Sequence, residues 1–219
     1  MGKDKLKRFE ENKSFGCLYQ PEFSEIFRKD YFMKGRWNSD HFRNGNPVVL
    51  ELGCGRGEYT VALASREPGK NFIGVDIKGA RMWRGAKTAT EEGLTNAAFL
   101  RCRIEFIEWA FAPDEVSEIW ITFPDPQMKS ENKRLTSPAF IERYKKFLKP
   151  GGIIRLKTDS SFLYEYTLDL VNSRDDLTLL EANDDIYGTG RADEILSVKT
   201  RYESHFLALG SKIHLLVFS

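Results

Sequence analysis

The stretch of sequence that decides the fold is VVLELGCGRG, residues 48–57, followed directly by EYTVALAS, residues 58–65. Its first five residues form an apolar run, broken only by Glu51, which is typical of a strand buried on both faces. Three glycines at alternate positions then permit a tight turn, and the apolar spacing after them is helical. The stretch therefore predicts a buried strand, a glycine-rich turn and a helix, the ligand-binding unit of open α/β sheets.

The same alternation of strands and helices continues toward the carboxyl terminus. The apolar patterns predict further strands at 71–76, 97–102, 118–123 and 153–158, and further helices at 80–92, 138–148 and 163–172. Beyond them we expect a strand at 177–181, a loop at 184–191, a helix at 192–209 and a buried strand at 213–218. This order predicts an α/β fold with a doubly wound, mostly parallel sheet that has helices on both faces.

Length and composition indicate one globular domain with an extension. The 219 residues, 41% hydrophobic and 13% aromatic, can bury a full core. We expect a Rossmann-like domain over residues 47–219 and a basic amino-terminal arm over 1–46, whose order and flexibility the pattern leaves open. A short helix at 21–32 is compatible with its sequence.

Several classes of protein are excluded at this stage. No apolar run approaches the roughly 20 residues of a membrane helix, so no membrane partner is expected. The charged residues 1–11 do not resemble a secretory signal. Cys17, Cys54 and Cys102 lie far apart, which predicts reduced thiols in a cytoplasmic protein and no metal site. Oligomeric state cannot be inferred from these features.

The net charge of +1 hides an uneven distribution of charge along the chain. One basic group, comprising Lys3, Lys5, Lys7 and Arg8, lies at the amino terminus, and a second comprises Lys129, Lys133, Arg134, Lys145 and Lys146. Such a chain can present one basic face to a nucleic acid. The alternative is that each run is a solvated helix surface.

The spacing of glycines and acids in the turn favours a cationic ligand over a dinucleotide. The turn reads GxGxG, with Glu51 two residues before Gly53, whereas a pyrophosphate requires amide donors and no adjacent carboxylate. S-adenosylmethionine carries a sulfonium and an ammonium, which a carboxylate favours. We expect Gly53, Gly55 and Gly57 to let it approach the backbone. Asp76, at the end of the second strand, is positioned to accept hydrogen bonds from ribose hydroxyls.

Two features of this cofactor hypothesis have plainer alternatives. Asp76 could instead cap the following helix, and Glu51 could be a surface residue. An NAD-dependent oxidoreductase remains a rival class, against which both the GxGxG spacing and Glu51 count.

The most distinctive segment is ITFPDPQMK, residues 121–129, which leads into KRLT at 133–136. Two prolines flank Asp125 and stiffen the chain where it leaves the sheet. With LKTD at 156–159 and TRYE at 200–203, this segment resembles the tRNA (guanine-N7-)-methyltransferase family. The resemblance extends from about residue 48 to 218 and implies a class I S-adenosylmethionine-dependent methyltransferase that acts on guanine N7 in tRNA, at position 46 of the variable loop.

The resemblance also implies roles for individual residues. Glu51, Asp76 and Asp125 would contact the cofactor, and Asp125 is the catalytic assignment. The substrate nucleotide would contact Lys129, Asp159, Thr200, Arg201, Tyr202 and Glu203. Three departures concern details: Gln127-Met128 follows Asp-Pro where the family has Trp-Pro or Trp-His, the basic stretch is shortened at 130–132, and Arg103 stands where the family places an acid near adenine, so it is a cofactor-binding candidate.

The chemistry of this reaction requires alignment more than proton transfer. Guanine N7 has an in-plane lone pair, so no general base is needed, and carboxylates such as Asp125 and Asp159 would stabilise the positive charge that moves onto the purine. The remaining alternatives are a methyltransferase acting on another RNA, a protein or a small molecule, and a non-catalytic RNA-binding module on the same fold.

Overall fold

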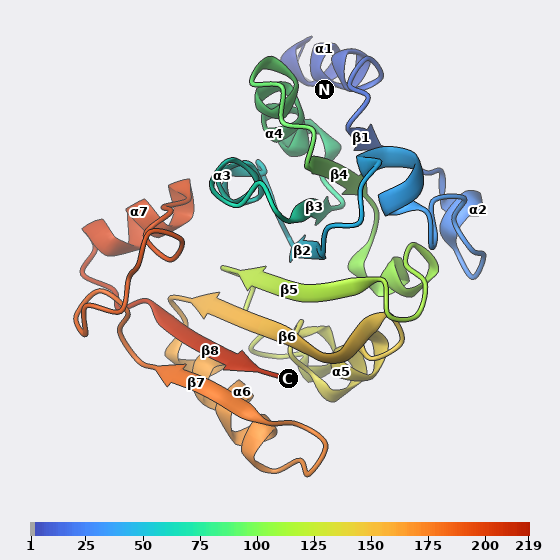
Figure 1. Ribbon diagram of the computed structural model, residues 1–219. Helices are drawn as coiled ribbons and strands as arrows, with labels where there is room; N and C mark the ends of the chain where they lie inside the picture. The colour runs from blue at the N-terminus through green and yellow to red at the C-terminus, as the bar shows by residue number, and fades with distance from the viewer. Residues whose placement is uncertain (1–2) are drawn as a thin grey trace.

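The chain folds around one eight-stranded sheet in the computed structural model, which describes residues 3–219, with side chains from residue 6 onward (Figure 1). The strand order is β1-β4-β3-β2-β5-β6-β8-β7. Strands β1 to β6 pair in parallel, and β8 and β7 close the sheet as an antiparallel edge. The bounds are β1 (Leu18–Tyr19), β2 (Val48–Leu52), β3 (Asn71–Asp76), β4 (Ala97–Arg101), β5 (Val116–Thr122), β6 (Leu148–Thr158), β7 (Leu179–Asn183) and β8 (His214–Phe218).

The predicted doubly wound fold is confirmed, and its switch point lies beside the glycine turn. From β2 the chain proceeds through β3 to β4 on one side and then returns to place β5 and β6 on the other. The carboxyl ends of β2 and β5 are therefore neighbours from which the connections diverge, the place where open α/β sheets bind ligands.

Helices cover both faces of the sheet. Their bounds are α1 (Lys3–Asn12), α2 (Phe23–Ile26), α3 (Glu58–Arg66), α4 (Gly79–Glu91), α5 (Pro138–Tyr144), α6 (Ser161–Asn172) and α7 (Arg201–Ala208), with a π-helix η1 (Trp37–Phe42) and 3-10 helices η2 (Ile104–Trp109) and η3 (Glu131–Lys133). None of the helices among the described residues has the length and apolar character of a membrane span.

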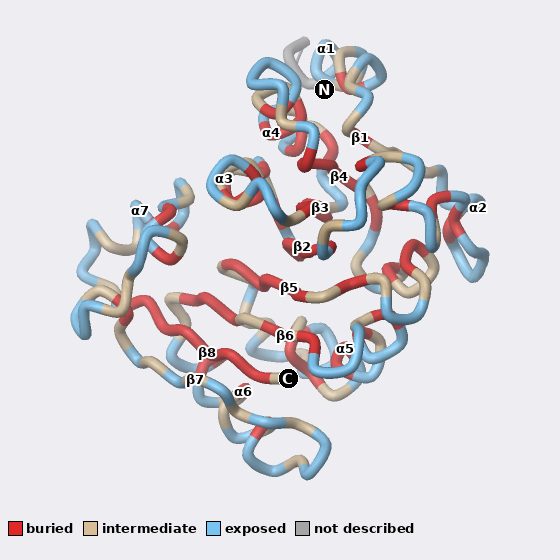
Figure 2. Tube along the Cα trace, in the orientation of Figure 1, coloured by how far each residue is buried: buried red, intermediate tan, exposed pale blue. Residues whose placement is uncertain are grey.

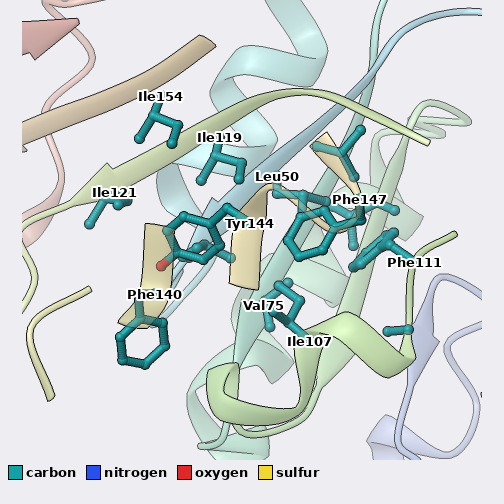
Figure 3. Close-up of a cluster of buried hydrophobic side chains, with 14 of the residues drawn as sticks. Leu50, Val75, Ile107, Phe111, Ile119, Ile121, Phe140, Tyr144, Phe147 and Ile154 are labelled. Carbon is teal, nitrogen blue, oxygen red and sulfur yellow. The ribbon is translucent and has the colours of Figure 1, made fainter. Parts of the chain in front are cut away.

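Two hydrophobic clusters follow from the alternation of side chains along each strand. Leu50 and Ile119 point toward the aromatic side chains of Phe140 and Tyr144 on α5 (Figure 3). Their neighbour Val49 faces the opposite cluster, with residues of α3 and α4. All of β2 is buried, as the red tube along this strand in Figure 2 shows. Burial on both faces explains why its sequence is apolar except for Glu51.

The first 46 residues were predicted as an extension, and their described part packs onto the domain. The strand β1 adds an edge to β4, and Asn12 of α1 donates from Nδ2 to the carbonyl of Gly79 at 3.0 Å. Trp37 is fully buried and donates from Nε1 to the carbonyl of Ala110 at 3.0 Å. The side chains of Lys3 and Lys5, members of the basic group predicted to face a nucleic acid, lie outside the described residues. The helix compatible with 21–32 is limited to α2.

Two helix predictions in the second half of the chain were wrong in extent. The helix expected over 192–209 comprises only α7, because residues 192–200 are irregular, with turns at 194–197 in which Asp193 accepts from the amides of Ile195 and Leu196. The helix expected over 138–148 ends at Tyr144, and β6 begins at Leu148, ahead of the Pro-Gly-Gly segment. Local apolar spacing did not distinguish these turns from helix, since long-range contacts decide them.

Candidate active site

A cavity of about 850 Å³ opens at the carboxyl ends of β2, β3, β5 and β6. A second cavity of about 440 Å³ adjoins it and shares seven lining residues, among them Asp76 and Asp125. The helix α7 lies on the side toward which β5 and β6 point and contributes the far wall (Figure 1). Of the residues predicted for the site, the larger cavity is lined by Glu51, Gly53, Gly55, Asp76, Asp125, Asp159, Thr200, Arg201 and Tyr202.

The three glycines of the turn all have a left-handed backbone conformation, but they have different roles. Their φ angles are +79° at Gly53, +55° at Gly55 and +70° at Gly57, a region that favours glycine. A Cβ at Gly53 would meet nothing within 4 Å and one at Gly55 only a backbone oxygen at 3.9 Å, so the space above them is open. A Cβ at Gly57 would lie 2.4 Å from Cε1 of Phe99. Gly57 therefore serves packing and does not line the cavity.

Glu51 is a buried carboxylate at the floor of the cavity, with 4% of its surface exposed. Its Oε2 accepts from the Thr60 amide at 2.9 Å and from the Thr60 hydroxyl, and its Oε1 accepts from the Thr122 hydroxyl at 2.7 Å. Burial raises the pKa of Glu51 to about 7, and the hydrogen bonds from Thr60 and Thr122 oppose that rise. The alternative that Glu51 is a surface residue is thereby excluded.

Asp76 joins the glycine turn to the start of α4. Its Oδ2 accepts from the Gly55 amide at 3.0 Å, and its Oδ1 accepts from the Lys78 amide at 2.7 Å. Asp76 is not the cap of α4, because the N-cap position is held by Lys78 and no side chain caps this helix. Asp76 instead fixes the turn before α4 and lines both cavities, and each of its carboxylate oxygens keeps a second lone pair for a ligand.

Asp125 is held at the rim by a strained loop. Phe123 and Gln127 both have φ of +48°, a left-handed conformation that costs non-glycine residues free energy and that clusters at functional sites. The amide of Phe123 donates to the Lys157 carbonyl at 2.8 Å, and Oδ1 of Asp125 accepts from the Gln127 amide at 3.0 Å. The loop thus presents an exposed carboxylate to both cavities.

The wall opposite Glu51 combines the end of β6 with the start of α7. Asp159 and Ser160 follow β6 directly, and Thr200 caps α7 by accepting the Glu203 amide at 3.2 Å on its hydroxyl. The Arg201 amide donates to Oε2 of Glu58 at 2.9 Å, which attaches α7 to the first turn of α3. Segments more than a hundred residues apart therefore meet at one site.

Known proteins with these features are methyltransferases. A family model described as "Putative methyltransferase" matches residues 45–216. A tRNA (guanine-N(7)-)-methyltransferase of Christiangramia forsetii is 52% identical over 214 residues, which cover 96% of this chain and 95% of that relative. One of Bacteroides thetaiotaomicron is 50% identical over 218 residues, covering 100% of this chain and 86% of the relative.

This chain belongs to the tRNA (guanine-N7)-methyltransferase family. The resemblance inferred from its motifs is confirmed. Solved structures support the fold alone: the 16S rRNA methyltransferase KamB superposes with a TM-score of 0.61 at 15% identity over 82% of this chain and 90% of that one. A geranyl diphosphate C-methyltransferase from Streptomyces coelicolor A3(2) superposes with a TM-score of 0.52 at 19% identity, over 83% of this chain and 73% of that one. The class I methyltransferase fold is confirmed.

Besides Gly57, three residues predicted for this methyltransferase site do not line the larger cavity. Arg103 lines only the smaller one, and Lys129 is exposed and lines neither. Glu203 is fully buried and lies 2.8 Å from the ammonium of Lys157, so its carboxylate is directed into the protein and away from the cavity. The TRYE motif therefore contributes its first three residues to the wall, and its fourth to the interior.

Part of the predicted basic stretch is paired with acidic neighbours. Lys145 pairs with Asp176, and Lys146 pairs with Glu108. Arg134 is 8% exposed and lies over the ring of Tyr166 at 4.3 Å. The fold therefore pairs the charges at 145–146, whereas Lys129 and Lys133 have no acidic partner within 4.0 Å among residues whose side chains are described.

Other cations, which sequence reasoning missed, line the cavities. They are Arg56, Lys78 and Arg81, joined by Lys133 from the predicted stretch. Among residues whose side chains are described, none of the four has an acidic partner within 4.0 Å. Lys78 and Arg81 follow Asp76 by two and five residues. Their position at a helix start, directly after a strand end, could have predicted from the sequence that they lie near the cavity. His205, Phe206 and Ser160 were also missed.

Proposed function

We propose that this protein transfers a methyl group from S-adenosylmethionine to N7 of a guanine in tRNA, with position 46 of the variable loop as the expected target. The observation that carries the proposal is the convergence of Glu51, Asp76 and Asp125 on an open glycine turn, in a chain of this family. Methyl transfer then needs only a nucleotide on the opposite wall, where Asp159 and Tyr202 lie.

The residues of the cavity fit S-adenosylmethionine. The open space above Gly53 and Gly55 admits a ligand to the backbone, and the donor has no phosphate that Glu51 would repel. Glu51 favours the positive charges of the donor, at short range or through water. Asp76 keeps unused lone pairs with which to accept from ribose hydroxyls. Arg103, in the smaller cavity, remains a prediction for the adenine end.

The chain contributes alignment and charge to the reaction. When bound, S-adenosylmethionine supplies an electrophilic methyl group on a sulfonium. No side chain has to remove a proton, because N7 attacks with its own lone pair. Asp125 and Asp159 border the same cavity and stabilise positive charge developing on the purine. Holding the reactants in line can supply roughly 7–11 kcal/mol of barrier lowering in favourable systems.

Two kinds of side chain are available to bind the RNA. Tyr202 is 57% exposed at the wall of the cavity and offers a ring on which an unstacked base can lie. Arg56, Lys78, Arg81 and Lys133 have free charges for phosphates, in place of the paired Lys145 and Lys146. Lys129 stays a predicted nucleotide contact. The cysteines are free, which agrees with the proposed cytoplasmic location.

The test is incubation of the protein with unmodified tRNA and labelled donor, followed by digestion to nucleosides. We expect label in N7-methylguanosine, and none when the target guanine is replaced by adenine. Label in another nucleoside would identify a different RNA methyltransferase. Incorporation that requires a protein or small molecule instead of RNA would refute the proposal, as would tRNA binding without turnover.

A further inference from the structure

A buried ion pair lies behind the nucleotide side of the cavity, outside the residues that line it. Neither Lys157, on β6, nor Glu203, on α7, has exposed side-chain surface, and they approach to 2.8 Å. Glu203 also accepts the hydroxyl of Tyr187 at 2.8 Å. Charges withdrawn from water in this way persist only when partners satisfy them, so the contact restricts where α7 can lie.

The ammonium of Lys157 is saturated by one short segment of chain. Besides Glu203, it donates to the carbonyl of Leu196 at 2.6 Å and to that of Val198 at 3.3 Å. A lysine has three donors, and all three acceptors lie between residues 196 and 203. One side chain therefore fixes both the irregular path before α7 and the first turn of α7 itself.

The backbone of the same residue supports the opposite rim. The carbonyl of Lys157 accepts the amide of Phe123 at 2.8 Å, which begins the loop that carries Asp125. Two residues after Lys157, the strand delivers Asp159 to the cavity. Lys157 is thus the junction of the Asp125 loop, the end of β6 and the start of α7.

The order of residues in TRYE has a local physical reason as well. Thr and Glu three positions apart form the pattern of a capping box, and Thr200 does accept the Glu203 amide. In a capping box the carboxylate would return to the backbone amide of the capping residue. Here the carboxylate of Glu203 instead turns inward to Lys157, so the start of α7 is bound to the sheet.

We propose that Lys157 and Glu203 are positioning residues, which hold Thr200, Arg201 and Tyr202 over the nucleotide side of the cavity, and that Glu203 does not touch the guanine. The proposal rests on the methyl transfer proposed above. It assigns the fourth residue of the motif a role different from that of the first three, because only those three reach the cavity.

A double-mutant cycle distinguishes positioning from direct contact. Lys157→Met and Glu203→Met each leave one buried charge unpaired and should lower kcat/KM for tRNA by at least about 30-fold. The double variant removes both buried charges but leaves the carbonyls of Leu196 and Val198 without their donor. It should therefore be at least about fivefold more active than Glu203→Met, without reaching the kcat/KM of the wild type. Donor affinity, measured by calorimetry, should stay within about threefold throughout. A double variant as impaired as Glu203→Met would overturn the proposal.

Hydrogen exchange of residues 196–208 gives a readout that does not depend on activity. Tyr187→Phe removes one hydrogen bond to Glu203 without exposing a charge, so it serves even if the single methionine variants fail to fold. We expect faster exchange of this segment and a raised KM for tRNA; wild-type values for both would contradict the role of the pair. Lys212→Met, at the exposed pair with Asp184, is the matched control and should change neither.

The two proposals fail in different ways. If the wild-type protein does not methylate tRNA, the proposed function is wrong, whereas hydrogen exchange in the same variants still reports whether Lys157 and Glu203 hold α7. If tRNA methylation is normal in wild type but the double variant shows no recovery, only the positioning role is wrong.

Discussion

The buried carboxylate of Glu51 should make the affinity for S-adenosylmethionine rise between pH 5.5 and 7, a range in which the donor itself stays mostly in one protonation state. Burial raises the pKa of Glu51 to about 7, and a cationic ligand favours the ionised form. At that pKa about 3% of the carboxylate is ionised at pH 5.5 and half at pH 7, so apparent affinity should rise about fifteenfold between them. The donor's α-amino group, with an ordinary pKa near 7.7–8.0, stays protonated over most of this range.

The assay is titration calorimetry with S-adenosylmethionine at pH 5.5, 6.2 and 7, in two buffers with different ionisation enthalpies. Below pH 7 the wild type should release a proton on binding, and the Glu51→Gln variant should bind weakly with no pH dependence. Turnover with both substrates saturating should be flat over the same range, because N7 needs no base. An equal pH dependence of donor affinity in Glu51→Gln, or no pH dependence in the wild type, would refute this reasoning.

The raised pKa of Glu51 should also make the stability of the ligand-free protein depend on pH. A carboxyl group whose folded pKa lies above its unfolded value of 4.5 lowers the free energy of unfolding as pH rises from about 4.5 through about 7. The penalty above pH 7 is at most about 3 kcal/mol. Urea unfolding should therefore show Glu51→Gln to be more stable than wild type at pH 8 and similar to it at pH 4.5.

Three further predictions follow from the geometry of the cavity. Gly57→Ala should lower the free energy of unfolding by about 3 kcal/mol in urea, because its Cβ would meet Phe99 at a left-handed φ, whereas Gly53→Ala should cost about 1–2 kcal/mol and mainly weaken donor binding. Asp125→Asn can keep the hydrogen bond from the Gln127 amide, so its melting temperature should not change while kcat falls about 10- to 100-fold. Lys78→Ala and Arg81→Ala should each reduce the slope of log K for tRNA against log salt by about 0.7–0.9, and Lys145→Ala should not. A reduced slope for Lys145→Ala, with the wild-type slope in Lys78→Ala and Arg81→Ala, would return the RNA contact to the α5 region.

The sequence located the motif residues at strand ends better than it located those on a helix. Glu51 lies one residue before the end of a strand, Asp76 ends a strand and Asp159 directly follows one, so finding the strands also located the acids. Glu203 lies on a helix, where one turn presents side chains both to the cavity and to the interior. Choosing between those directions required the position of Lys157, 46 residues away.

Sequence by itself determined the strands after residue 47, the glycine turn, the doubly wound fold and the acids at the strand ends, because burial on both faces leaves apolar runs that neighbouring residues reveal. The short edge strand β1 was not predicted. Tertiary structure alone decided which charges are free, that Gly57 packs on Phe99, and that residues 192–200 wrap a buried lysine instead of forming a helix. The physical reason is that a charge or a backbone carbonyl is satisfied by whichever partner the fold brings near, and those partners lie dozens of residues away.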